Sequence, residues 1–356
     1  MQGTGTSSFA GVSSTVGLNV GENNTLSLGN NFTVAGNMNV DGTFNIGAYQ
    51  LTVSGAGSVS GSTGAAIING TGSVRFTSTR SVLSGSNLTI VPNTSINGSY
   101  TITNNGSVVF AGNLSATTAA AKWVNAANSI LTLGGDILTT GILNASAAPN
   151  TVFYNKAGDQ GVKIPLSSYY NLTLTNSGTK TFASAGTINV TNMVTLQDAV
   201  IFDVSTNTLN GVGGLTMNGT SELRLARSAT VPELTGTYNI TGGTITLNGA
   251  GNQTIRSLNA VPSAYYNLNL ANTAIKSLAG AITVQNNLTL SSTAQLDVGA
   301  SNYMITLGGH WNVTSTNADP FVQRNGTVLF NGIAEQTIST VLAGGETFYN
   351  FTVNNP

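Results

Sequence analysis

The stretch ITVQNNLTLSSTAQLDVGASNYMITL, from Ile282 to Leu307, decides the fold of this chain. Four short segments in it alternate apolar, polar and apolar residues: ITV at 282–284, LTL at 288–290, LDV at 296–298 and ITL at 305–307. A period of two residues is typical of β-strands, whereas a helix repeats about every 3.6 residues. Strands this short and this frequent fit the sides of a coil better than the arms of antiparallel hairpins. The stretch therefore predicts an all-β parallel β-helix, or β-solenoid.

The same alternation runs through the N-terminal part, as in LNV at 18–20, LSL at 26–28, FTV at 32–34 and MNV at 38–40. Since one coil of roughly 18 to 25 residues cannot bury its inward side chains alone, stacked coils must share one core. At about 4.8 Å per coil, roughly 14 to 19 coils would form an elongated rod on the order of 70 to 90 Å long. We expect stacked Asn side chains to form hydrogen-bonded ladders between coils.

Three copies of one module mark the C-terminal part of the chain, at about 151–174, 244–270 and 327–353. Each module has a strand ending in Asn, then a Gln, then an aromatic pair followed by Asn, as in TITLN at 244–248, Gln253 and YYNLNL at 265–270. Their spacing varies, so loops absorb the difference. We therefore divide the chain into degenerate coils over 1–130 and coils with clear landmarks over 131–356, continuous with the first part.

Composition excludes several classes of function. The 356 residues include 11 Lys and Arg, 12 Asp and Glu, one His and no Cys. A net charge of −1 gives no basic field for nucleic acid or an anionic membrane, and no apolar run is long enough for a membrane-inserted helix. Without Cys there are no disulfides or thiolate sites, and we expect no metal and no cofactor.

The acidic residues offer one candidate catalytic cluster. Asp198 and Asp203 are close in sequence, and Glu222 and Arg224 follow about one coil later. One interpretation is a polysaccharide-processing site, which needs grouped acids and a cation. The other, which we prefer because the modules at Thr151 and Thr327 lack this cluster, is a surface ion-pair network worth roughly 0 to 1 kcal/mol per pair.

The remaining candidates are aromatic residues and the single histidine. In each module's aromatic pair we expect one ring to pack inward and the other to lie outward, and we assign surface contacts to Tyr169 and Tyr265. The alternative is aromatic stacking that fixes the register of the coils. We expect His310 to be a surface or corner residue, and Trp123 and Trp311 to be packing residues.

The segments ITLGG at 305–309, NGTVLFNG at 325–332, EQTI at 335–338 and FYNFTVNN at 348–355 resemble repeats of large secreted surface proteins of Bacteroidetes-type bacteria. That family consists of parallel β-helical adhesins and filament proteins. The resemblance implies a secreted, extracellular protein of the cell surface. It is carried by residues 131–356, since residues 1–130 share only composition with it.

The last module opens with FYNFTV at 348–353, and its continuation is missing from the sequence, so either the chain was cut from a longer protein or the next coil comes from another molecule. An uncapped coil exposes strand edges and apolar side chains that template further pairing. We expect self-assembly through Phe348, Tyr349, Phe351 and Val353, head to tail or laterally. The sequence thus predicts a non-enzymatic fibre subunit or adhesin stalk whose partners are further copies, surface glycans or other cells. The alternative is a carbohydrate-binding or carbohydrate-cleaving β-helix.

Overall fold

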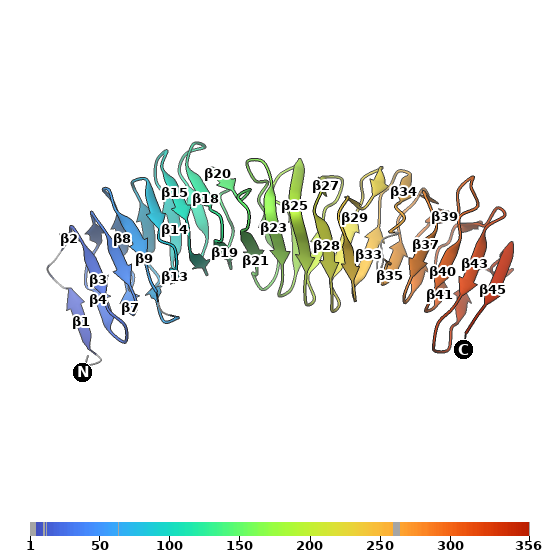
Figure 1. Ribbon diagram of the computed structural model, residues 1–356, viewed down its shortest axis with the longest axis horizontal. Helices are drawn as coiled ribbons and strands as arrows, with labels where there is room; N and C mark the ends of the chain where they lie inside the picture. The colour runs from blue at the N-terminus through green and yellow to red at the C-terminus, as the bar shows by residue number, and fades with distance from the viewer. Residues whose placement is uncertain (1–4, 10, 12, 63, 259–263, 356) are drawn as a thin grey trace. The chain divides into compact units, whose positions relative to one another are not determined.

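The computed structural model describes residues 5–9, 11, 13–62, 64–258 and 264–355. These residues contain no helix; about 48% lie in strands, and the sheets are parallel and stack as a β-solenoid of about 16 turns (Figure 1). This confirms the predicted fold class. Residues 259–263 of the second module lie outside the described part. The chain forms two compact units, unit 1 (Met1–Thr173) and unit 2 (Leu174–Pro356).

From the first strand to Leu133, each coil of unit 1 contributes one strand to each of three sheets, so every third strand in that part belongs to the same sheet. The first sheet contains β1 (Thr6–Phe9), β4 (Thr25–Leu28), β7 (Thr43–Asn45), β10 (Ile67–Asn69), β13 (Asn87–Ile90), β16 (Ser107–Phe110), β19 (Ile130–Leu133) and β21 (Thr151–Tyr154). The second contains β2 (Ser14–Thr15), β5 (Phe32–Val34), β8 (Gln50–Val53), β11 (Ser73–Phe76), β14 (Asn93–Ile96) and β17 (Leu114–Ala116). The third contains β3 (Leu18–Val20), β6 (Met38–Val40), β9 (Ser58–Ser60), β12 (Arg80–Val82), β15 (Thr101–Asn104), β18 (Lys122–Asn125) and β20 (Ile142–Asn144). The strands β22 (Gln160–Val162) and β23 (Tyr169–Leu174) follow.

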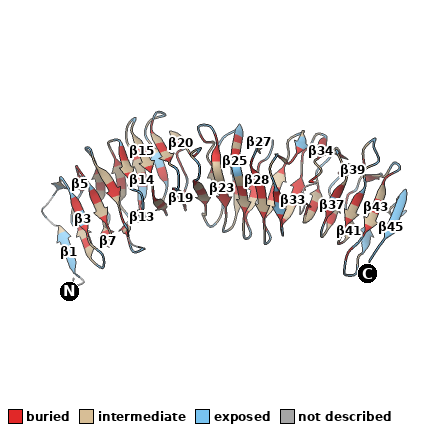
Figure 2. Ribbon diagram, in the orientation of Figure 1, coloured by how far each residue is buried: buried red, intermediate tan, exposed pale blue. Residues whose placement is uncertain are grey.

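Unit 2 is built in the same way, from strands that alternate buried and half-buried residues (Figure 2). Its long sheet contains β24 (Thr179–Phe182), β26 (Ile201–Asp203), β29 (Glu222–Leu225), β33 (Thr244–Leu247), β35 (Asn267–Leu270), β38 (Leu288–Leu290), β41 (Trp311–Val313) and β44 (Ile338–Thr340). A second sheet contains β30 (Thr230–Val231), β34 (Gln253–Ile255), β36 (Ile275–Leu278), β39 (Gln295–Asp297) and β42 (Phe321–Val322), and a third contains β37 (Ile282–Val284), β40 (Ile305–Leu307), β43 (Thr327–Phe330) and β45 (Asn350–Val353). The long β25 (Thr187–Leu196) pairs with β27 (Thr208–Gly211) and β28 (Gly214–Met217), which pair in turn with β31 (Glu233–Leu234) and β32 (Tyr238–Ile240).

The core of each unit consists of columns of inward side chains that stack from coil to coil. The strand register of unit 1 aligns one such column of buried residues: Leu26, Phe44, Ile68, Ile90, Phe110 and Leu133. In unit 2 the long sheet aligns another: Phe202, Leu223, Ile245, Leu268, Leu288 and Trp311. Burying each of these side chains contributes roughly 1.5 to 3 kcal/mol. The stacking of coils therefore supplies the stability that no single coil has.

Two glycines in unit 1 test how tightly the coils are stacked. Gly55 has φ of 69°, and a Cβ there would lie 2.0 Å from the carbonyl oxygen of Ala35 in the preceding coil, whereas Gly85 has φ of 77° and open space around it. Left-handed backbone alone costs roughly 1 to 2 kcal/mol in a residue with a Cβ. We expect Gly85→Ala to lower the free energy of unfolding by about that amount, and Gly55→Ala to lower it further because the clash adds to the same strain. Urea denaturation followed by circular dichroism measures both; equal losses would contradict the close stacking.

Candidate functional site

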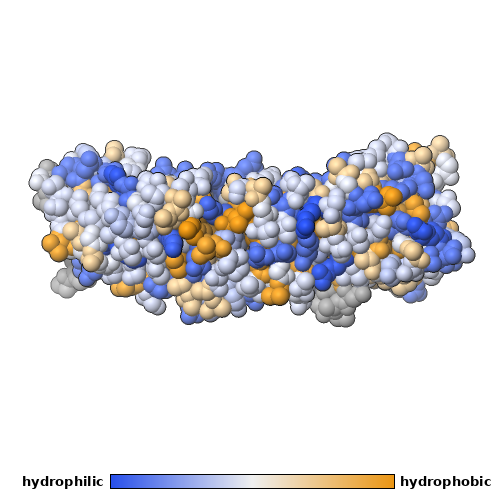
Figure 3. Space-filling model, turned by 90° about the horizontal axis from the view of Figure 1, so that it is seen from above, coloured by the Kyte–Doolittle hydropathy of each residue, from blue (hydrophilic) through white to orange (hydrophobic). Residues whose placement is uncertain are grey.

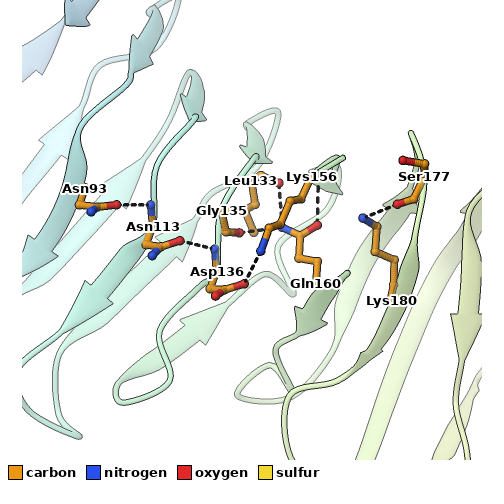
Figure 4. A network of polar contacts seen from close by, with 9 residues as sticks. All are labelled: Asn93, Asn113, Leu133, Gly135, Asp136, Lys156, Gln160, Ser177 and Lys180. Carbon is orange, nitrogen blue, oxygen red and sulfur yellow. Dashed lines mark hydrogen bonds and ion pairs between the residues drawn. The ribbon is translucent and has the colours of Figure 1, made fainter. Parts of the chain in front are cut away.

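Asn and Asp side chains join the corners of neighbouring coils. In unit 1, Asn93 Oδ1 accepts the Asn113 N–H at 2.9 Å, and Asn113 Oδ1 accepts the Asp136 N–H at 2.8 Å (Figure 4). The same bond occurs in unit 2, where Asn302 Oδ1 accepts the Asn325 N–H at 3.0 Å. Each bond satisfies a backbone N–H of one coil with an Asn side chain of the preceding coil. A bond between stacked Asn side chains also occurs, from Asn104 Nδ2 to Asn125 Oδ1 at 2.8 Å in the following coil, which confirms the predicted contact.

The glutamine that recurs in the three modules also joins coils: Gln160, Gln253 and Gln336. Gln253 Nε2 donates to the carbonyl oxygens of Leu225 at 2.9 Å and Arg227 at 3.0 Å, in the preceding coil, and its Oε1 accepts the Gly249 N–H at 2.9 Å. Gln160 (Figure 4) and Gln336 form the same pattern of bonds with their own neighbours. The sequence repeat is therefore a repeated structural contact.

Two buried lysines were not foreseen from the sequence. Lys276 Nζ donates to the carbonyl oxygens of Gly249 at 2.7 Å and Thr273 at 2.9 Å, and Lys180 Nζ donates to the Ser177 carbonyl at 3.0 Å (Figure 4). Burial removes water from the ammonium group and lowers the pKa of Lys276 to about 8. Both lysines fix loops of unit 2 from inside the coil.

The Lys276 ammonium predicts a pH dependence of stability. Between pH 8 and about 10.5 the Lys276 side chain is protonated in the unfolded chain and deprotonated in the folded chain. The free energy of unfolding therefore rises with pH over this window. Below pH 8 the cost of burying the charged ammonium group lowers the free energy of unfolding by its full amount. We expect Lys276→Met to reduce this rise, relative to the wild type. Urea denaturation at pH 7, 8, 9 and 10 measures it, with the half-exposed Lys122→Met as control. An unchanged pH profile in Lys276→Met would contradict the prediction.

The four residues of the candidate catalytic cluster do not form one site. Asp198 lies at a corner before β26, where its Oδ2 accepts the Thr175 hydroxyl at 2.6 Å and the Asn176 N–H at 3.2 Å. These hydrogen bonds lower the pKa of Asp198. Asp203 stands at the other end of β26. Asp198 is therefore part of the corner contacts and is separated from the other three residues by a strand.

The other three residues lie together on the outer face of the long sheet. Asp203 is the register partner of Arg224, whose Nη2 lies 2.8 Å from Glu222 Oε2. Glu222 Oε1 accepts the Thr246 hydroxyl at 2.6 Å, and the carboxylate of Glu222 raises the pKa of Arg224. This geometry matches the preferred interpretation, a half-exposed ion pair with hydrogen bonds along the sheet.

Across the described ranges, no three His, Cys, Asp or Glu side chains are grouped so that they could hold a metal ion. Nor does any helix in those ranges have the length and apolar character needed to cross a membrane.

The assignment of Tyr169 and Tyr265 to surface contacts is wrong, because both side chains are fully buried. The Tyr169 hydroxyl donates to the Lys163 carbonyl at 2.5 Å and lies 2.8 Å from the Tyr154 hydroxyl, and the Tyr265 hydroxyl donates to the Arg256 carbonyl at 2.6 Å. Since each phenol finds its partner inside the coil, the ring packs inward, and burial raises the pKa of both tyrosines. The second residues of these two pairs, Tyr170 and Tyr266, are half-buried, as expected for the outward ring.

The histidine and the tryptophans have the predicted structural positions. The Nδ1 atom of His310 accepts the Thr337 N–H at 3.1 Å and lies 2.9 Å from the Thr337 hydroxyl, so it joins two coils at a corner. Trp123 and Trp311 are fully buried, and Trp311 packs edge-on against Phe321 at 4.8 Å between ring centres.

Among the described residues of unit 2, the core positions of β44 and β45 are exposed. Ile338 follows buried Trp311 in register, Phe351 follows Val328, and Val353 follows Phe330, but these three are 42%, 48% and 59% exposed. Together with the exposed Tyr349 they form what we call the end face (Figure 2). Phe348, the fourth residue of the predicted self-assembly interface, is half-buried against the Trp311 ring at 5.2 Å.

The end face also has a hollow and unpaired backbone groups. A depression of about 150 Å³ lies between Phe330, Ile338, Phe351 and Val353. In β45 the N–H groups of Asn350 and Asn354 bond to the preceding coil. Because successive N–H groups of a strand point to opposite sides, those of Phe351 and Val353 face the free edge. The end face therefore has the shape and the hydrogen-bonding groups to receive another coil.

In comparisons with known proteins, no protein-family model, no curated protein sequence and no solved structure matches this chain.

Proposed function

We propose that this chain is a non-enzymatic, extracellular structural protein, a β-solenoid that builds a fibre or adhesin stalk on a bacterial surface by end-to-end stacking of copies. The observation that carries the proposal is the end face, where apolar side chains at core positions are exposed among the described residues. Burying such side chains is the main driving force of association. The placement outside the cell rests on the resemblance of the repeat landmarks to secreted surface proteins.

A second copy is the occupant that fits the end face best. A solenoid coil is the one structure that offers parallel strands at the same spacing with inward apolar residues in the same alternation. Among the described residues, β1, β2 and β3 are the terminal strands of their sheets. Their coil also encloses a depression of about 280 Å³ lined by Phe9, Leu18, Val20 and Leu26, among others. A head-to-tail contact between unlike surfaces produces an open filament when its rotation does not close a ring, and we propose the open form here.

The weak charge of the chain supports the same assembly. Only 6% of its residues are charged and the net charge is −1, so little repulsion opposes the approach of one copy to another. On the face drawn in Figure 3 most residues have pale, intermediate hydropathy, with scattered strongly hydrophilic and hydrophobic patches. Uncharged Asn, Thr and Ser side chains also permit rods to pack side by side.

Negative-stain electron microscopy and sedimentation velocity over a concentration series test the proposal. We expect filaments whose average length grows with protein concentration and whose thickness is that of one solenoid or a bundle of them. Purified chain that stays monomeric at high concentration, with its end-face amides already protected from exchange, would refute end-to-end assembly.

A further inference from the structure

The long sheet of unit 2 has a depression of about 380 Å³ on its outer face. Short polar side chains of β33, β35 and β38 and their flanks line it: Thr244, Asn267, Asn269, Asn287, Thr289 and Ser291. None of them is charged. The neighbouring strand β29 has Glu222 opposite Thr244, so the ion pair of Glu222 with Arg224 borders the depression on that side. We call this surface the polar groove.

One side chain of the polar groove is held rigidly in place. Asn267 Oδ1 accepts from Asn286 Nδ2 at 2.9 Å and from the Asn287 N–H at 3.1 Å, and its Nδ2 donates to the Gly243 carbonyl at 3.0 Å. With both Oδ1 and Nδ2 bonded to neighbouring residues, the Asn267 side chain is held in place and shapes the groove. The groove is thus preformed by the sheet, which lowers the entropic cost of binding.

Other groups of the polar groove are available to a ligand. Asn269 Oδ1 accepts the Ser291 hydroxyl at 3.1 Å, which orients the amide and leaves its NH₂ donors unused by the described residues. The hydroxyls of Thr244 and Thr289 likewise make no hydrogen bond within the described part of the chain. An amide NH₂ donates two hydrogen bonds, and a hydroxyl donates and accepts. The groove therefore offers donors and acceptors without charge.

These groups are repeated along the stack at the spacing of the strands. Register aligns Asn269, Thr289 and Asn312 on one outward line, with neighbouring strands about 4.8 Å apart. A pyranose polymer repeats its hydroxyls at a similar spacing, and sugar hydroxyls both donate and accept hydrogen bonds. A phosphate or carboxylate polymer would instead need cations, which the groove does not have.

We propose that the polar groove binds a neutral glycan chain lying along the stack of strands. This goes beyond the structural role, since it gives the outer face a ligand of its own. In a filament each copy would contribute one groove, so weak individual sites would add up to avid attachment.

Isothermal titration calorimetry of the full chain tests this with defined probes: the hexasaccharides of β-1,4-glucan, β-1,3-glucan, α-1,4-glucan and β-1,4-xylan, and hexagalacturonate as the charged probe. We expect at least one neutral hexasaccharide to bind and hexagalacturonate to bind more weakly. Lack of binding by all four neutral probes, or tighter binding of hexagalacturonate, would overturn the proposal.

Variants then assign the site. Thr244→Val with Thr289→Val removes both hydroxyls at nearly constant volume, and we expect about a tenfold weaker affinity for the neutral probe, from roughly one hydrogen bond's worth of net free energy or more. Asn269→Ala gives an independent variant if the double variant does not fold, as judged by circular dichroism. Thr132→Val, an outward position of β19 in unit 1, should leave binding unchanged. Equal affinity of the groove variants and the wild type would overturn the assignment.

Discussion

Replacing Gln253 by leucine should lower the free energy of unfolding by roughly 3 kcal/mol, because the change keeps the volume of the side chain but removes all of its hydrogen bonds. The Arg227 carbonyl and the Gly249 N–H lose the partner that Gln253 provides. Gln253 is almost fully buried, so water does not replace these bonds. Urea denaturation and amide exchange of β29 and β34 measure the loss.

An exposed glutamine serves as a matched control, because it shows how much stability a Gln→Leu change costs where no buried contact is lost. Gln295 donates one exposed hydrogen bond, to the Asp319 carbonyl at 2.6 Å, so Gln295→Leu should cost less than about 1 kcal/mol. The equivalent of Gln253 in the third module, Gln336, is only half-buried, and Gln336→Leu should fall between the two. Similar losses for Gln253→Leu and Gln295→Leu would show that the module glutamine does not join the coils as described.

The substitution Val353→Asp should abolish filament formation while the monomer still folds. Val353 is 59% exposed in β45, so a carboxylate there stays hydrated in the isolated chain. In the proposed joint the same carboxylate would be buried without a partner, at a cost of several kcal/mol. We expect the concentration needed for assembly to rise by at least about a hundredfold, equivalent to roughly 2.7 kcal/mol, in sedimentation velocity.

Val212→Asp provides the control for this experiment. Val212 is also highly exposed, at 70%, but it belongs to unit 2 away from the end face. The Val212→Asp variant should therefore assemble like the wild type. If both variants assemble like the wild type, the end face is not the joint; if both fail, loss of assembly reflects added charge rather than a specific contact.

The alternation of apolar and polar residues was sufficient to predict the solenoid, because inward positions stack into columns and outward positions reach solvent. Three of the segments in 282–307 match β37, β38 and β40, and the strand at the fourth, β39, begins one residue earlier than the LDV segment. In β39 Asp297 is nearly buried, since Arg324 bonds both its oxygens at 2.6 and 2.8 Å. Its partner is 27 residues away, so the period alone did not reveal this ion pair.

The orientation predicted from the sequence is wrong for tyrosines that stand in the alternating apolar and polar pattern of a strand. Tyrosine has an apolar ring and a polar tip, and whether it faces inward depends on a backbone acceptor that a linear pattern does not identify. For Tyr265 that acceptor is the carbonyl of Arg256. The buried lysines follow the same logic, although one signal was present: Lys180 and Lys276 each come eleven residues after the first tyrosine of a pair. Asp198 and Asp203 do not share a site because Asp198 lies before β26 and Asp203 is the last residue of that strand.

The most direct test of the central claim is residue-resolved hydrogen–deuterium exchange at β45, measured below and above the concentration at which filaments form. In the isolated chain the amides of Phe351 and Val353 face the free edge and should exchange rapidly, while those of Asn350 and Asn354, bonded to the preceding coil, exchange more slowly. End-to-end stacking predicts that Phe351 and Val353 become protected in filaments. Filaments in which both amides still exchange as in the monomer would contradict the account.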